Sequence, residues 1–181
     1  AACHTTEDDR LPHSLHAYFI RSGAMEREVR YEVERLRDGR SFSTRRVVAR
    51  QGDEVLASLA VSFQVSEPSI DVSTRAMPEV PSVHELPEHP WSPLVERRFI
   101  PTDELGRAAA WMRVTESLGD DPRLQLAALT FLSDDLPTDS VGMLHPERVL
   151  PGSGKWPFFN ASLDHTIHFH APVRVDRHHL H

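Results

Sequence analysis

A histidine-containing strand motif occurs twice in this chain, and this repeat limits what the chain can fold into. The first copy is Pro12-His13-Ser14-Leu15-His16-Ala17-Tyr18-Phe19, and the second is Asp164-His165-Thr166-Ile167-His168-Phe169-His170. Both run histidine, hydroxyl residue, aliphatic residue, histidine and then aromatic residues. Two copies about one small domain apart indicate a duplicated fold. Because Pro12 in the first copy corresponds to Asp164 in the second, we expect only the second half to keep a chemical role.

Length and composition exclude several classes of protein. The chain has 181 residues, enough for one large domain or two small ones. Its formal net charge of −7 disfavours a nucleic-acid partner, whose phosphates repel an acidic surface. The sequence has neither an apolar run of membrane-spanning length nor a secretory signal, so we expect no membrane insertion. Because Cys3 is the only cysteine, we expect no disulfide framework and a cytoplasmic location.

Both ends of the sequence look interrupted. The chain begins with Ala1-Ala2-Cys3-His4, without Met, in a pattern typical of the last turn of a helix. It stops at His178-His179-Leu180-His181, inside a strand-like region. We therefore expect a chain that is incomplete at both ends and belongs to a longer polypeptide.

The first half, residues 1–65, has the pattern of antiparallel strands. Apolar and charged residues alternate over 29–33, a period of two that predicts a half-buried strand. Arg37-Asp38-Gly39-Arg40 then predicts a hairpin turn, because Asp-Gly between alternating runs favours a two-residue loop. Two further strands are expected, over 41–50 and 55–64. These segments together predict a meander of long strands.

Residues 66–106 differ in composition from both flanking segments. Seven of the 14 prolines lie here, and this density argues against regular secondary structure. We interpret the segment as a linker laid over the surface between two halves. The expected organisation is therefore a first half over 1–65, a Pro-rich linker over 66–106 and a second half over 107–181.

The second half contains a well-marked helix. Either aspartate of Asp120-Asp121 can act as its N-cap, and Pro122 suits the first helical position. Apolar residues follow at helical spacing, and we expect Pro137 to end the helix. A loop through Pro151-Gly152-Ser153-Gly154 then leads to a strand over 162–170. Combined with the first half, this order predicts antiparallel strands that wrap a long helix, an α+β arrangement.

These residues resemble a known family. The resemblance is carried by residues 12–23, 31–47, 62–64 and 163–170, and the Arg37-Asp38-Gly39-Arg40-Ser41-Phe42 stretch is its most distinctive part. Over them the chain is similar to the acyl-CoA thioesterase II family of TesB type. The resemblance implies a double hotdog, in which two antiparallel sheets each wrap a long central helix. It also implies a homo-oligomer that hydrolyses acyl-CoA to free fatty acid and CoA, with no metal and no bound cofactor.

The same resemblance implies one catalytic residue in this chain, Asp164. In the family, an Asp of the second-half Asp-His-Ser/Thr motif acts with a hydroxyl residue and a Gln, which together polarise the attacking water. Asp164 matches that Asp. The hydroxyl residue and the Gln are expected beyond His181. Gln64 is interpreted as the first-half counterpart of the Gln, and Thr166 as a strand neighbour only.

Other hypotheses remain open for the same residues. A double hotdog could hold an acyl chain or CoA without cleaving it. His168-Phe169-His170 places two imidazoles on one face of a strand, as some metal sites do, but no Glu follows to complete a site, so no metal is predicted. Four histidines are expected to be structural and hydrogen-bonded: His13, His16, His165 and His168. Five arginines are expected on a solvated strand surface: Arg35, Arg37, Arg40, Arg45 and Arg46.

Overall fold

The structure, a computed structural model, describes residues 1–70, 72–74, 76–89, 92–147 and 159–181. The chain divides into two compact units, and each is described by itself. Unit 1 comprises Ala1–Ser69 and Ser162–Pro172, and unit 2 comprises Ile70–Ala161 and Val173–His181. Each unit contains one antiparallel sheet, so the expected α+β class with two antiparallel sheets is confirmed. The expected loop Pro151-Gly152-Ser153-Gly154 lies outside the described residues.

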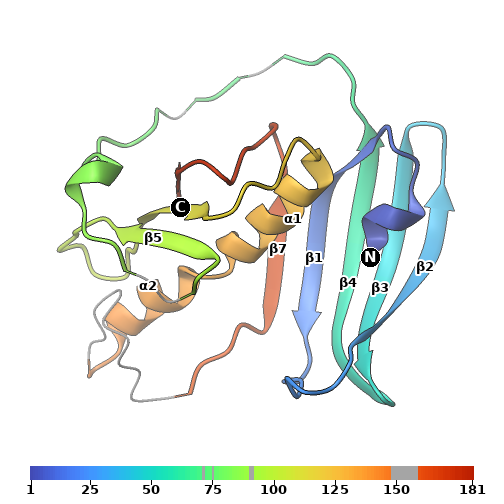
Figure 1. Cartoon of the computed structure of the whole chain (residues 1–181), viewed down its shortest axis with the longest axis horizontal. Helices are drawn as coiled ribbons and strands as arrows, with labels where there is room; N and C mark the ends of the chain where they lie inside the picture. The colour runs from blue at the N-terminus through green and yellow to red at the C-terminus, as the bar shows by residue number, and fades with distance from the viewer. Residues whose placement is uncertain (71, 75, 90–91, 148–158) are drawn as a thin grey trace. The chain divides into compact units, whose positions relative to one another are not determined.

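Unit 1 is built on a five-stranded antiparallel sheet with the strand order β2-β3-β4-β1-β7 (Figure 1). The chain between Gln51 and Glu54 turns at Gly52, whose φ of 59° lies in the left-handed region that favours glycine. The meander from β2 to β4 confirms the strands expected from the period-two pattern. The five strands are β1 (Arg10–Phe19), β2 (Arg30–Asp38), β3 (Phe42–Gln51), β4 (Glu54–Val65) and β7 (Asp164–His168).

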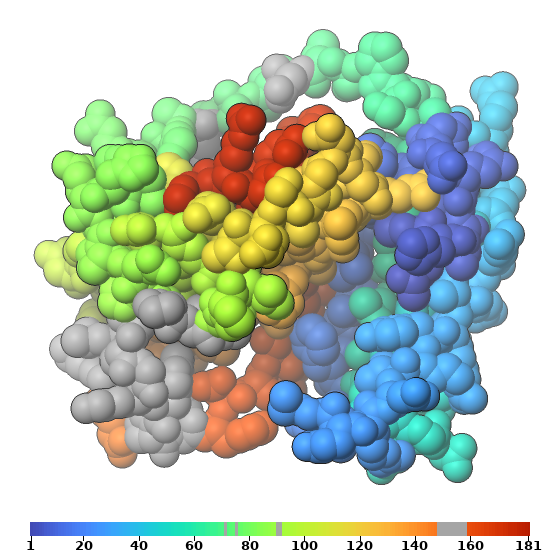
Figure 2. All heavy atoms as spheres, viewed as in Figure 1, coloured from blue at the N-terminus to red at the C-terminus, as the bar shows by residue number. Residues whose placement is uncertain are grey.

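One face of this sheet is apolar and is covered in part by the N-terminal turn η1 (Ala2–Thr5). Val47 on β3 and Val61 and Phe63 on β4 form a buried cluster with Ala2. Alternate residues of a strand point to the same face of a sheet, which is why Val47, Val61 and Phe63 lie on one face. Figure 2 shows the N-terminal residues in dark blue lying against the light-blue atoms of β2. The turn therefore covers part of the hydrophobic face of unit 1.

Arg45 anchors this turn, and its expected place on a solvated surface is wrong. The Arg45 side chain is 1% exposed. Its guanidinium donates to the hydroxyl and the main-chain oxygen of Thr5, both at 2.8 Å, and to the main-chain oxygens of Arg37 and Thr44. It also donates to Oδ1 of Asp38 at 2.5 Å. We call Arg45, Asp38 and Thr5 the buried arginine anchor.

Asp38, which belongs to the distinctive Arg-Asp-Gly-Arg-Ser-Phe stretch, is held by two side chains of β3. Hydrogen bonds from Arg45 and from the Ser43 hydroxyl lower the pKa of Asp38 below its usual range. Arg46, the next residue on β3, points the other way and is 56% exposed, as expected of a surface residue. Alternation along β3 therefore places one arginine in the interior and its neighbour in solvent.

Unit 2 combines a three-stranded sheet of order β5-β6-β8 with helices. The N-cap of α1 is Asp121, whose carboxylate accepts from the main-chain N–H of Arg123 at 2.9 Å, which confirms this helix start. Pro137 was expected to end the helix, but α1 ends at Ser133 and Pro137 begins α2, since proline suits a first helical position. The elements are η2 (Val83–Glu85), β5 (Val95–Phe99), β6 (Ala110–Val114), α1 (Pro122–Ser133), α2 (Pro137–Leu144) and β8 (His179–Leu180).

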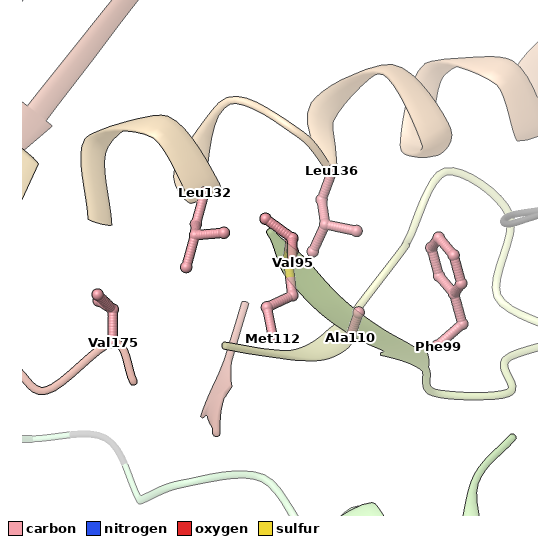
Figure 3. Packing of buried hydrophobic residues seen from close by; sticks show 7 residues of the cluster. All are labelled: Val95, Phe99, Ala110, Met112, Leu132, Leu136 and Val175. Carbon is pink, nitrogen blue, oxygen red and sulfur yellow. The ribbon is translucent and has the colours of Figure 1, made fainter. Parts of the chain in front are cut away.

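The core of unit 2 lies between the sheet and the two helices (Figure 3). Met112 on β6 is fully buried, and Leu132 at the end of α1 is 1% exposed. The expectation of a long helix wrapped by each sheet is met only here, because unit 1 has the short turn η1 and no α-helix among its described residues. The seven residues of the core are Val95, Phe99, Ala110, Met112, Leu132, Leu136 and Val175.

The segment expected as a Pro-rich linker, residues 66–106, contains regular structure. β5 (Val95–Phe99) lies in a stretch free of proline between Pro93 and Pro101, where Val95 and Phe99 lie on the same face of the strand and are both buried. The part before β5 packs on the same unit, since the Leu86 side chain is 6% exposed and its main-chain oxygen accepts from Arg98. The prolines therefore limit the length of the strand without excluding it.

A buried carboxylate, Glu96 on β5, is held by basic side chains. Its side chain is 8% exposed and accepts from the Nε atoms of Arg98 at 2.7 Å and Arg113 at 2.6 Å, and Nε2 of His178 lies 3.2 Å from it. Burial alone raises the pKa of Glu96, but the hydrogen bonds from Arg98, Arg113 and His178 outweigh it and lower the pKa to about 2. Glu96 therefore stabilises unit 2 in its ionised form.

Replacing Glu96 with Gln should give a pH-dependent loss of stability. Because the folded-state pKa lies below the ordinary value of 4.5, the stabilisation is fully present above pH 4.5 and is lost as the pH falls toward 2. We expect Glu96→Gln to lower the free energy of unfolding by about 3 kcal/mol at pH 7 and by much less at pH 3. Urea denaturation at several pH values measures this, with the exposed Glu116→Gln as control. An equal loss at pH 7 and pH 3 would contradict it.

Candidate functional site

The two copies of the histidine motif pair with each other. β1 and β7 are neighbouring antiparallel strands, and Figure 1 shows them side by side. Leu15 of the first copy lies opposite Ile167, its equivalent in the second copy. A local two-fold axis therefore passes between these two residues. We call the paired segments, residues 14–18 and 164–168, the repeat seam.

The hydrogen-bond pattern of the repeat seam shows which side chains lie closest. The main-chain N–H of Phe19 donates to the oxygen of Leu163, and that of Phe169 donates to the oxygen of His13, both at 2.9 Å. From one of these positions to the other, the cross-strand pairs are alternately hydrogen-bonded and non-hydrogen-bonded. The two side chains of a non-hydrogen-bonded pair lie nearer to each other. Three pairs are therefore close and share one face of the sheet: Ser14 with His168, His16 with Thr166, and Tyr18 with Asp164.

Two histidines of the repeated motif are hydrogen-bonded, as expected. Nδ1 of His16 and the Thr166 hydroxyl are joined across the seam at 2.9 Å. Nε2 of His13 and the Ser62 hydroxyl on β4 are joined at 2.8 Å. Partial burial lowers the pKa of His13, and the nearby His168 lowers it further. These contacts support the structural interpretation of His13 and His16.

The described residues show no metal site. The rings of His168 and His170 are stacked with their centroids 6.4 Å apart. No group of three or more His, Cys, Asp or Glu side chains within the described ranges could hold a metal ion. Likewise, none of the helices in this part of the chain has both the length and the apolar character needed to cross a bilayer.

Asp164 is the first residue of β7, and its side chain is exposed. It lies opposite Tyr18, which is also exposed. Within the described ranges, neither side chain has a hydrogen-bond partner. Gln64 lies opposite Leu11, at the end of β1 away from Tyr18, so the structure does not bring it to Asp164. Thr166 is on the same face as Asp164, but its hydroxyl is joined to His16.

Tyr18 is the site residue that sequence reasoning missed. The sequence showed it only as one of the aromatic residues that follow the first histidine pair. Pairing of the two copies places it beside Asp164, and the ring of His16 lies 4.5 Å from its ring, centroid to centroid. No local sequence signal could have found it, because Tyr18 is set opposite Asp164 only by the antiparallel pairing of the copies about Leu15 and Ile167.

A duplicated chain with two antiparallel sheets defines a hotdog-like protein, and its carboxylate lies where the two copies meet. Two family models match consecutive parts of the chain. The model of the acyl-CoA thioesterase N-terminal domain matches residues 1–64, and that of the acyl-CoA thioesterase C-terminal domain matches residues 73–181. The chain belongs to the acyl-CoA thioesterase II family of TesB type, a family of double hotdog proteins.

Individual relatives support the same family. Acyl-coenzyme A thioesterase 8 of Mus musculus is 29% identical over 97% of this chain and 63% of its own length. The structure of a tesB protein of Mycobacterium avium subs paratuberculosis has a TM-score of 0.80 at 31% identity and covers 99% of this chain and 67% of that one. The structure of the acyl-CoA thioesterase II TesB2 of Mycobacterium marinum has a TM-score of 0.79 at 34% identity and covers 99% of this chain and 70% of that one. The chain thus spans 63% of the length of the mouse relative.

Proposed function

We propose that this protein hydrolyses acyl-CoA thioesters to a free fatty acid and CoA. The observation that carries the proposal is the match of two thioesterase domain models to consecutive parts of the chain. The mouse relative is named an acyl-coenzyme A thioesterase, and the Mycobacterium marinum structure is named an acyl-CoA thioesterase II. Acyl-CoA is accordingly the proposed substrate.

In the proposed reaction Asp164 activates a water molecule. The carboxylate accepts a proton from the water while the water oxygen bonds to the thioester carbonyl carbon. This addition gives a tetrahedral oxyanion. The carbon–sulfur bond then breaks, and the CoA sulfur takes the proton. The products are the carboxylic acid and the CoA thiol, so Asp164 is regenerated. Its exposed, unpartnered carboxylate at the start of β7 supports this role, because bound water and substrate can reach it.

We also propose the arrangement of helices, subunits and location that the sequence predicts. In it each sheet wraps its own central helix, and the protein is a cytoplasmic homo-oligomer. The turn η1 on the apolar face of unit 1 supports the first point, since it lies where such a helix would pack. The location and the oligomeric state stay predictions.

A non-catalytic relative that binds acyl-CoA is the second candidate function. One observation favours it: among the described residues no hydroxyl or amide side chain is hydrogen-bonded to Asp164, and the nearby Thr166 hydroxyl is joined to His16 instead. Binding of acyl-CoA without hydrolysis is therefore the alternative that an experiment must distinguish from hydrolysis.

The test is release of the CoA thiol from a saturated long-chain acyl-CoA by the purified protein, followed with a thiol-reactive dye. Multiple turnovers per active site are expected. Calorimetry with a non-hydrolysable thioether analogue, in which a methylene group replaces the carbonyl, measures binding separately. Tight binding of the analogue with no thiol release above the buffer rate would favour the binding protein. Absence of both would overturn the proposed substrate class.

A further inference from the structure

Tyr18 and Asp164 form a matched pair of unused polar groups on one face of unit 1. They are direct cross-strand neighbours at a non-hydrogen-bonded position, where side chains approach most closely. Tyr18 is 57% exposed, so a ligand can reach this residue. A phenol is a hydrogen-bond donor and an ionised carboxylate only an acceptor, so the pair offers both functions side by side.

The Tyr18 ring has a defined neighbour on its own strand. The ring of His16 lies 4.5 Å away at an interplanar angle of 47°. His16 is itself tied to Thr166 by the hydrogen bond across the seam at 2.9 Å. The strand that carries Asp164 therefore also fixes the imidazole that packs against Tyr18. This chain of contacts sets the position of the phenol relative to Asp164.

The pair exists at one end of the repeat seam only. The local two-fold axis relates Asp164 to Pro12 and Tyr18 to His170, because the copies match with Leu15 at Ile167. Pro12 has no side-chain acceptor and is buried. Only the end with Tyr18 and Asp164 thus combines a carboxylate with a phenol. The duplicated strands consequently offer one such site and not two.

We propose that the Tyr18 hydroxyl donates a hydrogen bond to the thioester carbonyl oxygen while Asp164 activates the attacking water. This inference rests on the proposed function and adds a catalytic residue from the first half of the chain. Negative charge develops on the carbonyl oxygen as water adds, and a donor aimed at that oxygen stabilises the transition state. Tyr18 remains protonated throughout, so the proton balance of the reaction is unchanged.

The test compares Tyr18→Phe with Tyr31→Phe and Asp164→Asn in steady-state hydrolysis of a long-chain acyl-CoA. The chain has two tyrosines, and Tyr31 on β2 is also 57% exposed, which makes it a matched control. We expect Tyr18→Phe to lower kcat about 100-fold with KM within about twofold, as for the loss of one oxyanion donor. Tyr31→Phe should keep wild-type kcat and KM.

Each result of this comparison decides one point. Wild-type kcat in Tyr18→Phe together with an inactive Asp164→Asn would overturn the role of Tyr18 and leave the proposed hydrolysis standing. Wild-type kcat in Asp164→Asn would overturn the proposed site, and the role of Tyr18 with it. A rise in KM at unchanged kcat would make Tyr18 a binding contact only and overturn the inference. Unchanged thermal midpoints in all three variants exclude loss of folding as the cause.

Discussion

Replacing Asp164 with Asn is expected to lower kcat for acyl-CoA hydrolysis about 1,000-fold, the middle of the range for a general base. The amide has nearly the same size and shape as the carboxylate but cannot accept a proton from water. Because the Asp164 side chain is exposed and has no partner among the described residues, the substitution should leave stability unchanged. The measurement is kcat by thiol release, with the thermal midpoint recorded for each preparation.

A matched control is available for this substitution. Asp53 lies in the turn between β3 and β4 of the same unit and is also exposed. Asp53→Asn makes the same change of charge and should keep wild-type kcat. Equal activity in the two variants would mean that Asp164 does not activate water, and the proposed mechanism would then fail while the family assignment stood.

Replacing Arg45 with Met is expected to lower the free energy of unfolding by about 3 kcal/mol, in the range for breaking a buried polar network. The loss comes mainly from the oxygens of Thr5, Arg37 and Thr44, which lose their donor. Asp38 is 49% exposed and regains water, so the residual carboxylate adds little to the cost. Chemical denaturation of each variant measures the change.

Arg46 provides the control for this prediction. It is adjacent in sequence, lies on the opposite face of β3 and is 56% exposed, with an ion pair to Glu34 at 3.8 Å. Exposed ion pairs contribute about 0–1 kcal/mol, so Arg46→Met should change stability by less than about 1 kcal/mol. Equal losses in Arg45→Met and Arg46→Met would show that the buried arginine anchor does not hold the N-terminal turn.

The strands of unit 1 were predictable because local pattern and tertiary packing agree there. The period-two alternation before Asp38 and after Ser41 reports directly which residues face the core. The start of α1 was predictable for a similar reason, since Asp121 and Pro122 are local signals of a helix N-terminus. In such segments neighbours in sequence carry enough information to specify the element.

Arg45 was misjudged because its environment is made by residues distant in sequence. On a strand with arginines at both 45 and 46, the two faces cannot be told apart by residue type alone. The difference arises from Thr5, which is 40 residues away in the chain and supplies acceptors on one face only. β5 was missed for another reason, because the frequent prolines around this strand of five residues argued against regular structure there.

The residues of the candidate site, too, were predictable only in part. Asp164 could be proposed from the resemblance of its motif to a known family, and the structural role of His13 and His16 from the repeated histidines. The pairing partner of Asp164 could not, because no local pattern states which strand lies beside β7. Only the register of β1 against β7 places Tyr18 next to this carboxylate.

The repeat seam also bears on how the polypeptide matures. His16 and Thr166 are hydrogen-bonded partners 150 residues apart, so one edge of β1 stays unpaired until the residues between them have been synthesised. Long-range pairing of this kind slows folding, and an open strand edge can pair with other chains. Newly made protein should therefore depend on chaperone protection until β7 has been synthesised. Substitutions in β7 should lower soluble yield more than their effect on the free energy of unfolding suggests.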